Sequence, residues 1–192
     1  MIRHGQTEWN ALHRYQGHTD IKLNQAGRIQ ARQVAEYLYQ NEQIEAIYSS
    51  DLARSLETAQ IIAQEIKLPV TSDRRLREIH FGRWEGLTFR EVYDQFRQEF
   101  DTWFSNTADF RAPGGESFQD LIDRSLQAVQ DIAGKHSGTV AVATHGGVIM
   151  ALLYHLEVKA ELWKHGVPPG SLSDFEIGHE GIKVGNIGLE VG

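Results

Sequence analysis

The spacing of hydrophobic and polar positions predicts helices that alternate with short extended segments. Apolar residues recur at intervals of three and four, the period of an amphipathic helix, over residues 25–39, 50–66 and 115–133. A fourth helix is expected over residues 148–158. The expected inward faces of the first three helices are Ala31, Val34, Ala35 and Leu38; Leu52, Leu56, Ala59, Ala63 and Ile66; and Leu121, Ile122, Leu126, Val129 and Ile132.

Two apolar runs between these helices are typical of strands. Residues 44–50 form a short one, and the serines that end it, together with Asp51, are good helix N-cap types. Residues 139–144 are small or β-branched throughout, as in a strand buried on both faces of a parallel sheet. Strands alternating with helices predict an α/β fold, a three-layer α/β/α sandwich with a mostly parallel central sheet.

Aromatic residues become frequent in the middle of the chain. Nine of the eighteen aromatic residues lie between Phe81 and Phe110. We expect a single domain over residues 1–192 with a helical insertion at about 81–112, near the active site. The insertion has either a small core of its own or, in addition, a role as a lid over a pocket. A terminal hairpin is expected over residues 178–191.

Composition narrows the function classes. The 192 residues carry a net charge of −7, which disfavours general binding to nucleic acid or anionic membranes, although a local basic pocket for a small anion stays compatible with it. The absence of cysteine excludes disulfides, thiolate metal sites and a cysteine nucleophile. No apolar run of membrane-spanning length and no secretory signal is present, so we expect a cytoplasmic location.

Two histidines occupy equivalent places in the pattern. His4 in IRHG and His145 in VATHGG each follow an apolar strand that a glycine ends, and ligands bind at the carboxyl edge of open α/β sheets. A single histidine there is more often structural, but a pair in the same context favours function. Arg54 falls in the first turn of a helix, where a surface arginine would be the ordinary interpretation; with Arg3 and two histidines near the same sheet edge, a phosphate clamp is the better one.

A general acid is harder to choose from the residues. Glu78 borders the aromatic segment, but Arg74, Arg75 and Arg77 lie close enough to make it an ordinary ion-paired residue, and Glu85 is a rival. Nine histidines show no ligand spacing for a metal, and neither a phosphate-binding loop of the Walker type nor a serine-hydrolase elbow is present. Chemistry run by histidine without metal or cofactor is the interpretation that is left.

The motifs RHGQTEWN, SDLARSLETA, LREIHFGRWEGLT, PGGES and THGG, in this order, resemble the histidine phosphatase superfamily, which includes cofactor-dependent phosphoglycerate mutases. The resemblance covers nearly the whole chain. It implies that His4 becomes a phosphohistidine and that Glu78 is the acid. It also implies a phosphate pocket formed by Arg3, Arg54 and His145 with Asn10, and a substrate-contacting loop at Gln16 and Gly17.

The resemblance implies a metal-independent phosphomonoesterase acting on a small phosphorylated metabolite. FGRWEGLT followed by PGGES is similar to α-ribazole phosphatases of cobalamin assembly and to broad-specificity bacterial phosphatases. The alternatives are a phosphoglycerate mutase and a catalytically silent phospholigand-binding module; a homodimer is also possible. One feature departs from the family: only Met1 and Ile2 precede RHG, where relatives carry a strand of several residues.

Overall fold

A four-stranded parallel sheet forms the centre of the structure, a computed structural model that describes residues 1–105, 109–156, 166–178 and 180–192. The strands are β1 (Ile2–Arg3), β2 (Ile44–Ser49), β3 (Val70–Ser72) and β4 (Thr139–Thr144). Their order is β1-β4-β2-β3, and all three pairings are parallel. The predicted α/β fold is therefore confirmed.

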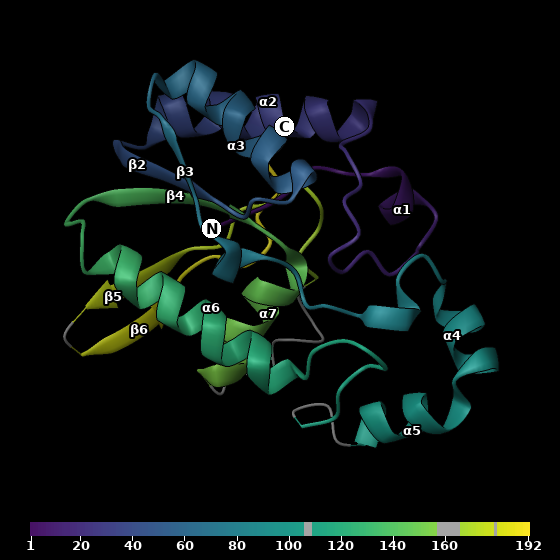
Figure 1. Cartoon of the computed structure of the whole chain (residues 1–192). Helices are drawn as coiled ribbons and strands as arrows, with labels where there is room; N and C mark the ends of the chain where they lie inside the picture. Colours follow the sequence, from purple (N-terminus) through teal and green to yellow (C-terminus); the bar gives the residue numbers. More distant parts are fainter. Residues whose placement is uncertain (106–108, 157–165, 179) are drawn as a thin grey trace.

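Helices cover both faces of this sheet (Figure 1). Helices α2 (Gln25–Asn41) and α3 (Ala53–Ile66) lie together on one face, and α6 (Phe118–Ala133) and α7 (Gly146–His155) lie on the other. Asn24 caps α2, and Ser117 with Asp120 forms a capping box at α6. The last residues of the helix expected over 148–158 lie outside the described residues.

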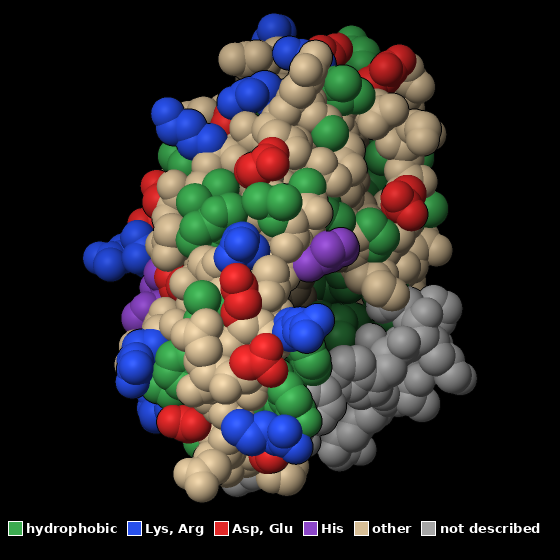
Figure 2. Space-filling model, turned by 90° about the vertical axis from the view of Figure 1, so that its right-hand side faces the viewer, with side chains coloured by type: hydrophobic (Ala, Val, Ile, Leu, Met, Phe, Trp, Pro, Cys, Tyr) green, Lys and Arg blue, Asp and Glu red, His purple; other side chains and the backbone are tan. Residues whose placement is uncertain are grey.

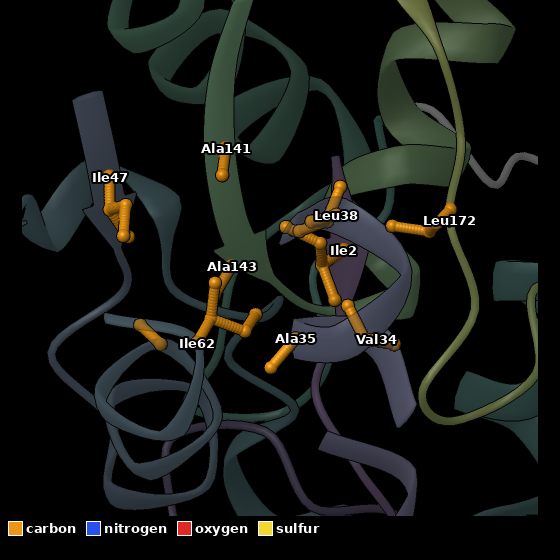
Figure 3. Packing of buried hydrophobic residues seen from close by; sticks show 10 residues of the cluster. Ile2, Val34, Ala35, Leu38, Ile47, Ile62, Ala141, Ala143 and Leu172 are labelled. Carbon is orange, nitrogen blue, oxygen red and sulfur yellow. The ribbon is translucent and has the colours of Figure 1, made fainter. Parts of the chain in front are cut away.

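Strand β4 divides its side chains between two cores, as a strand with helices on both faces must. Ala141 and Ala143 belong to the cluster beneath α2 and α3, which Figure 3 shows around Ile2, Leu38 and Ile62. Val142 points to the other side and packs with Leu76, Ala128 and Ile132. The small alanines allow α2 and α3 to pack closely over the centre of the sheet.

The buried face of α3 differs from the predicted stripe. Leu56, Ala63 and Ile66 are only half-buried, whereas the fully buried side chains are Arg54, Ser55, Thr58, Ala59 and Ile62. The polar first turn of this helix faces inward because polar groups of other segments lie there and bind it. Hydrophobic spacing takes no account of such partners. Its N-cap is Leu52, without a side-chain cap bond, rather than a serine or Asp51.

A similar correction applies to α6. Leu126 was expected on the inward face but is only half-buried, and the fully buried small residues Ser125 and Ala128 take that place. Ser125 meets its need for a hydrogen bond within the helix by donating to the Leu121 carbonyl. Small side chains at these positions allow α6 to approach the sheet.

The aromatic segment forms a local core beyond the edge of the sheet. It contains the short turn η2 (Gly82–Trp84) and helices α4 (Phe89–Gln95) and α5 (Arg97–Ser105). Its buried cluster consists of Trp84, Val92, Phe96, Phe100 and Ala112. This is the small separate core that the sequence predicted; the lid and the single-domain division stay predictions.

The remaining elements are short. Helix α1 (Glu8–Ala11) follows the first strand, and the turn η1 (Arg74–Leu76) follows β3. The terminal hairpin consists of β5 (Phe175–Gly178) and β6 (Gly181–Val184), so it starts earlier than expected. Within the described part of the chain, no helix is long and apolar enough to cross a membrane.

Candidate active site

Arg3 and His4 end a strand of only two residues, yet their backbone is held on both sides. On one side the His4 amide donates to the Thr144 carbonyl at 2.9 Å, and on the other the Arg3 amide donates to the Ser171 carbonyl at 3.0 Å. The Gly170 amide lies 3.1 Å from the carbonyl oxygens of both residues. The short β1 therefore fixes the start of the site without a longer strand before it.

His4 has one ring nitrogen committed and one available. The ring is 2% exposed, and Nδ1 lies 2.7 Å from the Gly5 carbonyl oxygen. Because a carbonyl can only accept a hydrogen bond, Nδ1 carries the proton of the neutral ring and Nε2 holds the lone pair. The Arg54 Nε donates to that Nε2 at 3.2 Å. The nitrogen of His4 whose lone pair is not bound to a proton is therefore Nε2.

Arg54 is fully buried, so the alternative of a surface arginine is wrong. Its Nη1 donates to the Thr19 carbonyl at 3.0 Å and its Nη2 to the Gly17 carbonyl at 2.7 Å. Burial lowers the pKa of the guanidinium to about 10, while the charge of Glu78 opposes that shift. The side chain stays cationic near neutral pH and fixes His4 relative to the loop at Gly17.

His145 lies against His4, with ring centroids 5.1 Å apart and an interplanar angle of 63°. It is the N-cap residue of α7 and is fully buried. Its Nε2 lies 2.8 Å from the Ser50 hydroxyl, whereas its Nδ1 has no hydrogen-bond partner among the described residues. Arg3 also has one bonded and one unbonded nitrogen. Its Nη1 donates to the Val167 carbonyl, but its buried Nε has no hydrogen-bond partner among the described residues.

Glu78 is held at the start of α7. Its Oε1 accepts from the Ile79 amide at 2.9 Å, and its Oε2 accepts from the Gly147 amide at 3.2 Å. A Cβ atom at Gly147 would lie 2.0 Å from Oε1, so the second glycine of THGG makes room for this carboxylate. The carboxylate thus reaches the helix that His145 begins.

The two carboxylates that the sequence left as rivals have different surroundings. Glu85 accepts hydrogen bonds from the His18 and Thr19 amides, each at 2.9 Å, and from the Phe81 amide, so its oxygens hold the loop in place. The nearby arginines do not pair with Glu78: Arg77 binds Asp51, as does Arg74 more distantly, and Arg75 binds Asp73 and Asp131. Among the described residues, the ion-pair alternative for Glu78 is therefore wrong.

Asn10 and Gln16 are joined through Thr7. The Asn10 Oδ1 accepts from the Thr7 amide at 3.0 Å, and the Gln16 Oε1 lies 2.9 Å from the Thr7 hydroxyl. These contacts use the amide oxygens and leave the amide nitrogens to donate elsewhere. Gly17 adopts a φ of +52°, and a Cβ atom there would lie 2.0 Å from a Glu85 oxygen, so glycine is required.

The structure brings the predicted residues together at the carboxyl ends of β1 and β4. His4, Arg54 and His145 form its buried centre, the half-buried Arg3 adds a buried Nε, and Glu78 borders the centre at α7. Figure 2 views the molecule from the side toward which β2 and β4 run, and shows a hollow with histidine and basic side chains at its rim. Acidic and basic side chains are mixed over this face. A small anion suits such a site better than an extended one.

Two residues that support this site were missed in the sequence. Ser50 was considered only as a helix cap, although it follows β2 directly as His145 follows β4, and that position was the available signal. Gly147 was seen only as a strand-ending glycine. In the described ranges, no group of three or more His, Asp or Glu side chains is arranged to hold a metal ion.

Burial and positive charge lower the pKa of both active-site histidines. For His4 and His145 alike, loss of solvation is the largest cause, followed by the charge of Arg54, and both pKa values lie well below 6.5. Both rings are therefore neutral near pH 7. A neutral His4 keeps the Nε2 lone pair available for reaction.

This burial predicts that acid destabilises the fold. Below pH 6.5 the two histidines bind protons in the unfolded chain but not in the folded protein. The free energy of unfolding should therefore decrease as the pH is lowered, by up to about 1.4 kcal/mol per pH unit for each ring. Urea unfolding at pH 7.5, 6.5 and 5.5 measures this slope. His145→Asn should flatten it, and a stability that rises toward pH 5.5 would contradict the prediction.

Comparison with known proteins places these residues in a family pattern. The model of the histidine phosphatase superfamily (branch 1) matches residues 1–189. Phosphoglycerate mutase-like protein 4 of Arabidopsis thaliana is 48% identical over 155 residues, which are 79% of this chain and 67% of that protein. The metal-independent phosphoserine phosphatase of the same plant is 43% identical over 155 residues, 79% of this chain and 65% of that protein.

Further similarities concern one bacterial enzyme and two solved structures. The glucosyl-3-phosphoglycerate phosphatase of Mycolicibacterium vanbaalenii is 42% identical over 161 residues, 79% of this chain and 70% of that protein. The structure of a mycobacterial glucosyl-3-phosphoglycerate phosphatase with VO3 has a TM-score of 0.83 and 32% identity, covering 96% of this chain and 95% of that one. An α-ribazole phosphatase from Shigella flexneri, with a TM-score of 0.85, 24% identity and coverage of 99% and 95%, shares the fold.

Proposed function

This chain belongs to the histidine phosphatase superfamily (branch 1), and we propose that it is a metal-independent phosphomonoesterase that forms a phosphohistidine at His4. The observation that carries the proposal is the state of the His4 ring. Its Nδ1 proton is committed to the Gly5 carbonyl, and its Nε2 lone pair lies at the Arg54 guanidinium. A neutral imidazole held in this way can act as a nucleophile. Because a cationic side chain lies beside it, the group that it attacks should be anionic, as a phosphoryl group is.

The first step transfers the phosphoryl group to the ring. The His4 Nε2 lone pair forms the N–P bond while the P–O bond to the leaving alcohol breaks. Phosphoryl transfer needs positioning and stabilisation of the charge on the equatorial oxygens more than covalent help. Three buried groups near His4 support this role: the Arg54 guanidinium, and the Arg3 Nε and His145 Nδ1, which have no partner among the described residues.

The protons of the two steps balance through Glu78. In the first step its carboxylic acid gives a proton to the leaving alkoxide. In the second, its carboxylate takes a proton from water as the water oxygen attacks phosphorus and the N–P bond breaks. The products are the alcohol and inorganic phosphate, and Glu78 ends protonated as it began. Two backbone bonds hold its oxygens in a fixed position at the start of α7.

The substrate is a small phosphorylated metabolite, and its identity is drawn from the relatives. Two of them are named for phosphoserine and for glucosyl-3-phosphoglycerate, at 43% and 42% identity. We place these two compounds first. α-Ribazole phosphate, expected from FGRWEGLT and PGGES, remains a candidate that rests on those motifs. The cytoplasmic location and the homodimer also stay predictions.

A phosphoglycerate mutase is the second candidate, because the relative at 48% identity is named as mutase-like. The same pocket serves both reactions: a mutase returns the phosphoryl group of the phosphohistidine to the substrate instead of to water. The outcome depends on whether water reaches the phosphohistidine before the acceptor hydroxyl does.

The proposal is tested by hydrolysis of a phosphoester panel in the presence of EDTA. The panel contains p-nitrophenyl phosphate, phosphoserine, glucosyl-3-phosphoglycerate, α-ribazole phosphate and 3-phosphoglycerate. Release of inorganic phosphate at a rate that EDTA does not lower is expected. A strict Mg²⁺ requirement would overturn the proposal, conversion of 3-phosphoglycerate to its 2-isomer would identify a mutase, and binding without turnover would indicate a silent phospholigand-binding module.

A further inference from the structure

The two histidines of the site use opposite ring nitrogens for their hydrogen bonds to neighbouring residues. The ring of His4 is tied at Nδ1 and available at Nε2, whereas the ring of His145 is tied at Nε2 and unpartnered at Nδ1 among the described residues. A buried N–H without a partner costs folding free energy, so such a group in a native site has a use. The question is whether the His145 Nδ1 carries a hydrogen or a lone pair.

The Ser50 hydroxyl decides this. Its oxygen lies 3.3 Å from the Leu52 amide, which can only donate, and 2.8 Å from the His145 Nε2. A hydroxyl oxygen can accept twice, but among the described residues His145 Nε2 is the acceptor found for the one hydrogen that the hydroxyl must donate, so we infer that Nδ1 is the protonated nitrogen of a neutral ring. Ser50 is itself fully buried, so solvent does not compete for this hydrogen.

We propose that Ser50 is a positioning residue whose hydroxyl holds His145 in the tautomer that presents Nδ1–H to a phosphoryl oxygen. The proposal rests on the proposed function, since it requires a phosphoryl group beside His4. The opposite tautomer would place a lone pair against phosphoryl oxygens that already carry negative charge. His4 and His145 therefore use the two tautomers of one side chain for different tasks, one giving an electron pair and the other a hydrogen bond.

The lowered pKa of His145 agrees with this geometry. Loss of solvation and the charges of Arg54, Arg124 and Arg3 disfavour its imidazolium, as does the neighbouring His4. A doubly protonated ring would donate from both nitrogens without any tautomer being chosen. The neutral ring needs a neighbour to choose it, and Ser50 is placed to do so.

Ring-nitrogen NMR of the ¹⁵N-histidine-labelled wild-type protein tests the tautomer directly. Long-range ¹H–¹⁵N spectra distinguish a protonated from a bare ring nitrogen, and a His145→Gln spectrum assigns the signals. We expect Nδ1 of His145 to be protonated and Nε2 bare. The reverse pattern would overturn the proposal even if the enzyme is a fully active phosphatase, and this readout does not depend on any Ser50 variant folding.

Kinetics of Ser50→Ala, with p-nitrophenyl phosphate in EDTA, test its consequence. We expect kcat to fall about tenfold to a hundredfold, the size found when a residue that orients an active-site histidine is removed, with mixed tautomers in the spectrum. Ser50→Thr, which keeps the hydroxyl, should recover most of the loss. An unchanged kcat in Ser50→Ala would contradict the proposal.

Ser49→Ala is the matched control. It removes a neighbouring buried hydroxyl that contacts the Ser50 carbonyl and the Ser55 hydroxyl rather than His145. It should leave both kcat and the His145 spectrum unchanged; an equal loss of kcat in both variants would mean that Ser50 is merely structural. If the wild type turns over no phosphoester, the proposed function fails, and the spectrum still reports the tautomer.

Discussion

His4→Ala is expected to lower kcat for p-nitrophenyl phosphate by roughly 10⁴-fold or more, the scale on which loss of a nucleophile acts. The substitution removes the Nε2 lone pair that Arg54 orients and leaves the cations around it in place. Wild-type protein quenched during turnover of a ³²P-labelled substrate should carry acid-labile label, and the variant should carry none.

His136→Ala is the matched control for this variant. His136 precedes β4 at the opposite end of that strand and bonds Glu45 at 2.9 Å and the Tyr48 hydroxyl at 3.0 Å. Its loss should leave both kcat and labelling at the wild-type level. If His4→Ala kept more than about a tenth of the activity while remaining folded, the phosphoryl acceptor would be another group.

Arg54→Ala is expected to reduce kcat/KM by about 10³-fold, since removal of one preorganised donor alone costs about 10²–10³-fold. It also leaves the buried Gly17 carbonyl without its Arg54 donor, whereas the Thr19 carbonyl still accepts from the Ile21 amide, so the melting temperature should fall. The charge of Arg54 lowers the pKa of His4, so its removal should raise that pKa and move the acidic limb of the kcat/KM profile to higher pH.

Two further variants separate the charge of Arg54 from its geometry. Arg54→Lys keeps a cation but cannot direct planar donors at three acceptors, so it should recover only part of the loss. Arg90→Ala removes an arginine whose side chain is 92% exposed and should change nothing. A variant Arg54→Ala that is destabilised but keeps its kcat/KM would reduce Arg54 to a structural residue.

Much of the fold could be predicted because its signals are local. Hydrophobic spacing located α2, α3 and α6, and the uniform apolar run located β4. The histidine-glycine junctions placed His4 and His145 at the same edge of the sheet, since parallel strands end together. The family resemblance then implied the role of Glu78, which the residues alone had left open, and it agreed with the phosphate clamp expected of Arg54.

What could not be predicted depends on partners distant in sequence. The turning of α3 that buries Arg54 and Thr58 follows from polar groups on other segments, such as the Gly5 amide that donates to the Thr58 hydroxyl. The contact of Ser50 with His145 joins residues 95 positions apart. Periodicity within one segment contains no information about such pairs, so hydrophobic spacing placed Leu52 and Ala59 inward correctly but missed the buried Arg54, Ser55 and Thr58.

The backbone around Arg3 has a consequence for when the protein becomes active during its synthesis. The partners of β1 are Ala143 and Thr144 on one side and the segment at Gly170 and Ser171 on the other. Such long-range pairings form late in folding, because the entropy cost of closing a large loop comes before the contacts that offset it. A nascent chain exposes the RHG motif long before the segment at Gly170 and Ser171 that completes its backbone pairing. The proposed enzymatic turnover therefore requires that the chain through residue 171 has left the ribosome and folded.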